Sequence, residues 1–148
     1  MRIAMFTEVF LPKVDGIVTR VTGTLDQLTA LGHEVVVFAP ANPPGYSRRR
    51  VPREHMHYGP NKVFRVRSMA LPVYPEVRVG LPTPGIAEQL RTFRPDIVHA
   101  VNPVWLAAYG VFAARRRQLP LLASYHTDLA SYTVKHNFGL LRAPMGTW

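Results

Sequence analysis

Hydrophobic residues lead directly into reactive side chains at one point of the chain. The apolar segment 119–125 is followed by His126, Thr127 and Asp128. An imidazole, a hydroxyl and a carboxylate can hydrogen-bond a polar substrate or transfer a proton. If 119–125 is a strand of a parallel sheet, His126 lies at its carboxyl end, where open α/β sheets bind their ligands. The pattern predicts a ligand site, although a histidine that merely follows a strand would give the same pattern.

A second polar segment follows another hydrophobic run. The run 96–100 leads into Val101, Asn102 and Pro103. If both runs are strands of one parallel sheet, their carboxyl ends meet at the same edge, so Asn102 and His126 contribute to one site. Asn102 is then a candidate ligand contact. Its alternative role is to form the turn that precedes Pro103.

The first forty residues have the pattern of a strand, a helix and a second strand. Segments 2–7 and 34–39 are short apolar runs typical of buried strands. Between them, one apolar stripe ends before Gly32, and Asp15 is a plausible cap at the start of this helix. A unit of this size predicts two parallel strands joined by a crossover helix. The residues of the stripe are Ile17, Val21, Leu25, Leu28 and Leu31.

The rest of the chain continues the alternation of strands and helices. Apolar and basic residues alternate over 62–67, which predicts a strand near the edge of the sheet. The proline-rich and glycine-rich segments 40–59 and 71–84 are expected to be loops without regular structure. This order predicts an α/β fold with a doubly wound, mostly parallel sheet in one domain. Helices are expected over 83–93 and 104–117, strands over 96–100 and 119–125, and weaker helical segments over 130–134 and 139–148.

Charge and composition narrow the class of partner. The 148 residues carry a net charge of +9 and include no cysteine, so neither a disulfide framework nor a thiolate metal site is available. Basic residues cluster at 48–53 and 115–117, and the excess of positive charge indicates an anionic partner: nucleic acid, a membrane surface or a phosphorylated substrate. Each cluster has a solvated face as its alternative role, which is favoured at 115–117 because cations in the last turn of a helix complement its dipole. Because nucleic-acid-binding motifs are missing, nucleic acid is not expected. No apolar run reaches the ~20 residues of a membrane span, so a cytoplasmic location is expected.

Several common catalytic motifs are absent. The loop 10–16 contains no G-x-G-x-x-G, and no phosphate-binding P-loop, G-x-S-x-G elbow or H-E-x-x-H pair occurs elsewhere. The six histidines include no i,i+4 pair, and no metal site is expected. Dinucleotide binding, serine hydrolase and zinc peptidase chemistry are therefore not expected.

The sequence resembles a known family in several segments taken together. Residues 6–20, 32–35, 95–99 and 124–127, with Asn102-Pro103, resemble the N-terminal domain of family 4 retaining glycosyltransferases of the GT-B fold. Within that family the chain is most similar to the sulfoquinovosyl-diacylglycerol synthases and the mannosyltransferases that act on glycolipids. The resemblance implies a Rossmann-like, acceptor-side domain over 1–148, truncated relative to the family because the donor-binding C-terminal domain is absent. It also implies that these residues alone do not transfer sugar.

The resemblance assigns roles to individual residues. His126 matches the histidine beside the donor sugar and is the expected catalytic residue, and Gly16 matches the glycine that the donor phosphates approach. Three alternatives stay open. Asp15 could act only as a helix cap, and Tyr125 could serve only for packing. Arg20 and Lys135 could be ordinary surface cations. The expected acceptor-binding residues are Asp15, Arg20, Asn102, Tyr125, Thr127 and Lys135.

The resemblance also implies the partners. A UDP- or GDP-sugar serves as co-substrate without a further cofactor, and the acceptor is a lipid or another hydroxyl compound. The basic segment 48–53 is expected to attract an anionic membrane, at the cytoplasmic face. Exposed Leu140, Leu141, Met145 and Trp148 would favour self-association or recruitment of the C-terminal half. The alternative is a non-catalytic α/β module that binds a phosphorylated ligand or partner.

Overall fold

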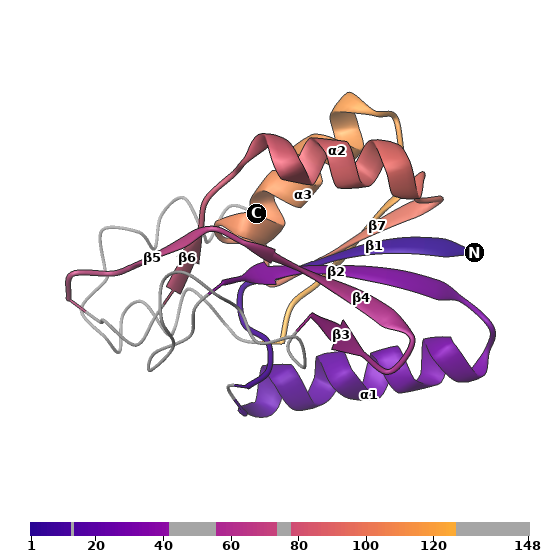
Figure 1. Ribbon diagram of the computed structural model, residues 1–148, viewed down its shortest axis with the longest axis horizontal. Coiled ribbons are helices and arrows are strands. Elements are labelled where there is room, and N and C mark those ends of the chain that lie inside the picture. The colour runs from indigo at the N-terminus through magenta and orange to yellow at the C-terminus, as the bar shows by residue number, and fades with distance from the viewer. Residues whose placement is uncertain (13, 42–55, 74–77, 127–148) are drawn as a thin grey trace.

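Eleven regular elements make up the part of the chain that the structure, a computed structural model, describes: residues 1–12, 14–41, 56–73 and 78–126 (Figure 1). The helices are α1 (Gly16–Ala30), α2 (Pro84–Phe93) and α3 (Leu106–Arg116). The strands are β1 (Arg2–Thr7), β2 (Glu34–Pro40), β3 (His57–Tyr58), β4 (Asn61–Val66), β5 (Ser68–Ala70), β6 (Arg78–Gly80), β7 (Ile97–Val101) and β8 (Leu121–Ser124).

Six of these strands form one sheet in the order β3-β4-β2-β1-β7-β8. Strand β1 pairs in parallel with β2 and β7, and β4 and β8 extend the sheet in parallel, whereas the two-residue β3 is antiparallel. Helix α1 covers one face, and α2 and α3 cover the other (Figure 1). The predicted doubly wound, mostly parallel α/β fold is confirmed. The strand predicted over 62–67 is β4, next to the edge strand β3.

Alternate residues of β1 pack on opposite faces of the sheet, as the two-residue period of a strand requires. Ala4 and Phe6 belong to the buried cluster that packs with α2 and α3, and Ile3 and Met5 belong to the cluster that packs with α1. Both faces of β1 are therefore buried, which explains its continuous apolar sequence. Phe6 stacks on Phe38 of β2 with ring centroids 4.5 Å apart.

Gly110 allows α3 to lie close against β1. A Cβ atom at this position would lie 2.6 Å from Cγ of Phe6, well inside the contact distance. Because glycine has no Cβ, the helix backbone can approach the Phe6 ring directly. This contact sets the distance of α3 from the sheet.

The two segments expected to lack regular structure contain short strands, so that expectation is wrong for them. Strand β3 lies inside 40–59 and is joined to β4 through Gly59, whose φ is +56°. Strand β6 lies inside 71–84 and pairs with β5, and Arg78 donates hydrogen bonds to Ser68 across that pair. These strands depend on contacts that a local pattern does not contain. Segments 42–55, 130–134 and 139–148 lie outside the described residues.

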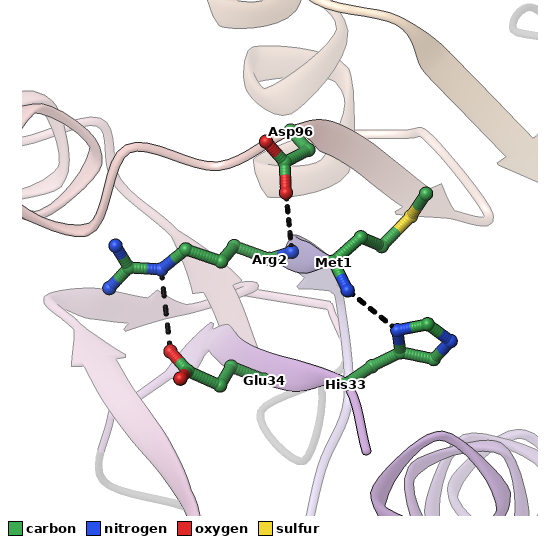
Figure 2. Close-up of polar contacts among 5 residues, drawn as sticks. All are labelled: Met1, Arg2, His33, Glu34 and Asp96. Atoms are coloured by element: carbon green, nitrogen blue, oxygen red, sulfur yellow. Dashed lines mark hydrogen bonds and ion pairs between the residues drawn. The ribbon is translucent and has the colours of Figure 1, made fainter. Parts of the chain in front are cut away.

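A set of polar contacts connects the amino ends of β1, β2 and β7 (Figure 2). The N-terminal amine of Met1 lies 2.7 Å from Nδ1 of His33, and the amide of Arg2 donates to Asp96 at 2.7 Å. The Arg2 side chain pairs with Glu34 at 3.3 Å. These contacts are exposed, so each contributes little stability. Together they connect the start of β1 to the starts of β2 and β7.

Within the described ranges, none of the helices combines the length and the apolar character that a membrane span requires.

Candidate functional site

The carboxyl ends of three strands lie in one row. Thr7 of β1 is the register partner of Val101 in β7, and Val101 is the partner of Ser124 in β8. Helices α1 and α3 follow β1 and β7, so both begin at this edge, which we call the carboxyl rim. The rim therefore collects the loop before α1, the turn after β7 and the residues after β8.

Asn102 connects two of these segments. Its backbone amide donates to the carbonyl of Ser124 at 2.8 Å, and its Oδ1 accepts from the backbone amide of His126 at 2.7 Å. Asn102 is only 4% exposed and has a φ of +46°, a left-handed conformation that asparagine tolerates better than most residues. The structure thus brings Asn102 and His126 together, and the Asn102 side chain forms the turn and holds the backbone of His126.

The His126 ring is part of a chain of three side chains. Its Nε2 lies 3.2 Å from Oγ of Ser124, and the same oxygen lies 2.8 Å from Nε2 of His99. His99 is half-buried in β7, and His126 is exposed at the rim. Burial lowers the pKa of His99, and the positive charge that His126 can carry lowers it further. His99 therefore favours its neutral form.

Asp15 and Gly16 begin helix α1. Asp15 is the N-cap, and its Oδ1 accepts from the amide of Val18 at 2.8 Å, so its alternative role as a cap is present in the structure. In the part of the chain that the structure describes, no atom lies within 4 Å of a Cβ added at Gly16, and φ at Gly16 is not positive. The fold therefore does not require glycine here. A bound group that approaches the backbone would require it.

Glu8, which the sequence pattern does not single out, lies at the N-terminus of α3. Its carboxylate accepts from the backbone amides of four residues: Val104 (3.3 Å), Trp105 (2.8 Å), Leu106 (3.2 Å) and Ala107 (2.9 Å). Burial raises the pKa of Glu8, and the four amide donors oppose that shift. The sequence carries one sign of this contact. The residue before α3 is a tryptophan, whose side chain cannot cap a helix, so another residue must accept from the first amides.

Comparison with known proteins identifies the family. Residues 14–148 match the family described as Glycosyltransferase Family 4. The chain belongs to this family. The fold agrees with the N-terminal half of its GT-B members, as the sequence resemblance implied.

Three relatives show which enzymes this family 4 chain is similar to. A GDP-mannose-dependent alpha-mannosyltransferase of Corynebacterium glutamicum is 32% identical over all of the chain and 34% of its own length. A sulfoquinovosyl transferase of Arabidopsis thaliana is 31% identical over 97% of the chain and 27% of its own length. An alpha-monoglucosyldiacylglycerol synthase of Acholeplasma laidlawii is 27% identical over 90% of the chain and 31% of its own length. The chain thus spans about a third of the length of these relatives.

Arg65 supports the loop before α1 in this family 4 domain. Its guanidinium donates to the carbonyls of Leu11 and Pro40 and lies 5.6 Å from the centroid of the Phe10 ring. It therefore links the carboxyl end of β2 to the loop that carries Gly16. The alternating pattern of 62–67 placed Arg65 among the polar residues but did not reveal this contact.

The remaining predicted site residues differ in what the structure says of them. Arg20 is exposed on α1, four residues after Gly16 and so on the same face of the helix. Tyr125 is 52% exposed between Ser124 and His126, so half of its surface is available to a ligand. Thr127, Lys135 and the basic segment 48–53 lie outside the described residues, as do Leu140, Leu141, Met145 and Trp148.

Among the residues that the structure describes, no three histidine, aspartate or glutamate side chains are grouped closely enough to hold a metal ion. The chemistry available at the described part of the rim is that of the His126 imidazole, the hydroxyl of the exposed Tyr125 and the amides of a helix N-terminus. Such groups bind anions and sugar hydroxyls and stabilise charge that develops during transfer.

Proposed function

We propose that this chain is the acceptor-side domain of a retaining glycosyltransferase that moves a sugar from a nucleotide sugar to a lipid hydroxyl. The observation that carries the proposal is the position of His126, whose backbone is held by Asn102 and whose ring is held by Ser124 at the carboxyl rim. An imidazole held at two points can present a nitrogen to a bound sugar in a defined direction.

The donor is proposed to be GDP-mannose. Support comes from the relatives named as GDP-mannose-dependent alpha-mannosyltransferases, which match all of the chain at 32% to 35% identity. The donor diphosphate would approach the backbone at Gly16, where no atom of the described residues occupies the space of a side chain. The N-terminus of α1 favours an anion at that position.

In the proposed reaction, the acceptor hydroxyl oxygen forms a bond to the anomeric carbon while the bond from that carbon to the diphosphate oxygen breaks. The hydroxyl proton passes to the departing phosphate oxygen on the same face, which retains the anomeric configuration. The sugar acquires positive charge along this path. His126 supports it by hydrogen bonding and electrostatic stabilisation, and it is not the base that removes the proton.

The acceptor is proposed to be a lipid at the cytoplasmic face of a membrane. A relative named as an alpha-monoglucosyldiacylglycerol synthase supports a lipid. Val14, Val73 and Trp105 are exposed and lie in three loops after the carboxyl ends of β1, β5 and β7. Exposed apolar groups suit a bilayer surface, and the basic composition of segment 48–53, which lies outside the described residues, suits an anionic one. Sedimentation of the protein with lipid vesicles at low salt tests this proposal. Equal amounts of protein bound to neutral and anionic vesicles would contradict electrostatic docking.

The active site is proposed to need a donor-binding half in addition to residues 1–148. Transfer requires the donor to be fixed against the acceptor, and that arrangement needs groups from both sides of the cleft. Mixing this chain with the remaining two thirds of the Corynebacterium glutamicum relative, with GDP-mannose and a lipid extract, tests the requirement. Labelled lipid should appear only when both parts are present.

In the same assay, a His126→Ala chain should lose at least about 99% of the transfer rate. Thr24→Ala on the exposed face of α1 is the control and should retain full activity. Undiminished transfer by the His126→Ala chain would remove this residue from the mechanism. Saturable binding of GDP-mannose without transfer would favour the non-catalytic binding module instead.

A further inference from the structure

We propose that His99 and Ser124 are positioning residues that orient the His126 ring, so that His126 meets its ligand through Nδ1 and not through Nε2. The inference rests on the proposed function, because it specifies how His126 faces the sugar. Neither His99 nor Ser124 was among the site residues expected from the sequence.

The backbone of His126 is the first fixed point. Its amide donates to Oδ1 of Asn102 at 2.7 Å, while the amide of Asn102 donates to the carbonyl of Ser124 at 2.8 Å. These two bonds join the end of β8 to the turn after β7. With the backbone held, only the side-chain torsions of His126 remain to be set.

The ring is the second fixed point. Nε2 of His126 lies 3.2 Å from Oγ of Ser124, which leaves Nδ1 as the ring nitrogen available to a ligand. An imidazole that lost this contact could rotate and present either nitrogen. The Ser124 hydroxyl therefore leaves one ring nitrogen, Nδ1, to face the ligand before the ligand binds.

His99 determines the direction of the hydrogen bond at Ser124. The hydroxyl carries a single hydrogen, and Nε2 of His99 lies 2.8 Å from the same oxygen. When the hydroxyl donates to one imidazole, it accepts from the Nε2–H of the other. Two neutral rings that share this hydroxyl must therefore hold opposite tautomers, one protonated at Nε2 and the other at Nδ1.

The environment of His99 supports this arrangement. Burial and the neighbouring His126 both lower the pKa of His99. His99 thus favours its neutral form, in which it can exchange one hydrogen bond with Ser124. Its position in the middle of β7, paired with Met5 of β1 and Leu122 of β8, keeps it fixed.

Ring-nitrogen NMR of the whole 148-residue chain tests the proposal without any assay of activity. At a pH where both rings are neutral, long-range proton–nitrogen spectra should show opposite tautomers for His99 and His126. In Ser124→Ala, His126 should become a mixture of both tautomers while the amide spectrum of the sheet is retained. Ser124→Thr keeps the hydroxyl and should restore the wild-type pattern. The same tautomer on both rings, or an unchanged His126 in Ser124→Ala, would overturn the proposal.

A second measurement uses the reconstituted two-part enzyme. Ser124→Ala should lower kcat by about tenfold and leave KM for GDP-mannose within about twofold, because the ring is misoriented and not removed. Ser124→Thr should recover most of the rate. If the wild-type pair shows no transfer, the proposed function fails, yet the NMR result still decides whether Ser124 orients His126. If transfer occurs but Ser124→Ala is fully active, the positioning role alone fails.

Discussion

Helices α1 and α3 begin at the same rim of the same sheet, yet the backbone amides at their N-termini are hydrogen-bonded in different ways. At α3 the Glu8 carboxylate accepts from four backbone amides, and burial surrounds it. At α1 the Asp15 side chain accepts from the amide of Val18, and the position of a Gly16 side chain is open space. At α3 a buried carboxylate thus occupies the amides of the first turn, whereas at α1 the Asp15 carboxylate caps the amide of Val18 beside a backbone that a ligand can approach at Gly16.

This difference teaches that a helix N-terminus at a ligand edge is not in itself a ligand site. The chain supplies a carboxylate at both N-termini, and what separates them is that Glu8 accepts from four amides of α3, whereas Asp15 caps the amide of Val18 beside an open backbone at Gly16. Glu8 makes α3 a structural element, which keeps the turn at Asn102 in place. The candidate donor site is therefore placed at α1, within the loop that Arg65 supports.

The largest effect is expected at α3. Glu8→Ala would leave four helix-terminal amides without their acceptor and should lower the free energy of unfolding by about 3 kcal/mol. Glu8→Gln retains one acceptor oxygen and should lose less than half as much. Urea denaturation measures both. A Glu8→Ala chain as stable as the wild type would show that α3 does not depend on this cap.

The next effect separates two glycines. Gly110→Ala places a methyl group 2.6 Å from the Phe6 ring and should lower the free energy of unfolding by about 2 kcal/mol. Gly16→Ala meets no protein atom and should change stability by less than about 0.5 kcal/mol. In the reconstituted enzyme, however, Gly16→Ala should lower kcat/KM for GDP-mannose by about tenfold or more. An active Gly16→Ala enzyme would mean that the donor phosphates do not approach this backbone.

A smaller effect is expected at the cap of α1. Asp15→Ala removes the acceptor of the Val18 amide and should lower the free energy of unfolding by about 1 kcal/mol. Asp15→Asn keeps a capping oxygen and should restore nearly all of that loss. If Asp15 also contacts the acceptor, Asp15→Asn should still raise KM for the lipid while stability is normal. Equal stability of the Ala and Asn variants would contradict the capping role.

The smallest effect concerns pH. Because burial and His126 lower the pKa of His99 below its ordinary value of 6.5, the unfolded chain binds this proton more readily than the folded chain. The stabilising contribution is present above pH 6.5 and is lost as the pH falls through the lowered pKa. Urea midpoints between about pH 8 and about pH 5 should therefore fall less steeply in His99→Gln than in the wild type. Parallel pH profiles would contradict this account.

Much of this arrangement could be predicted from the sequence. The apolar runs and the stripe from Ile17 to Leu31 identified the main strands and α1, because burial of one helix face or of both strand faces leaves a regular pattern. The rule that parallel strands end at one edge predicts from the sequence alone that Asn102 and His126 lie close together.

The remainder depends on contacts between residues far apart in the chain. Glu8 caps a helix almost a hundred positions away, and Ser124 connects His99 with His126 across two strands. The short strands β3 and β6 form in proline-rich and glycine-rich segments, where only pairing with a neighbour stabilises an extended chain. No periodicity within a window of residues reports such contacts.

Amide chemical shifts of the reconstituted enzyme on addition of GDP-mannose test the central claim most directly. The account predicts that Gly16, at the start of α1, and His126, after β8, shift together with one dissociation constant, while Trp105 and Ala107 at the capped start of α3 do not respond. Shifts centred on the α3 N-terminus, or a saturating donor that leaves Gly16 and His126 unchanged, would contradict it.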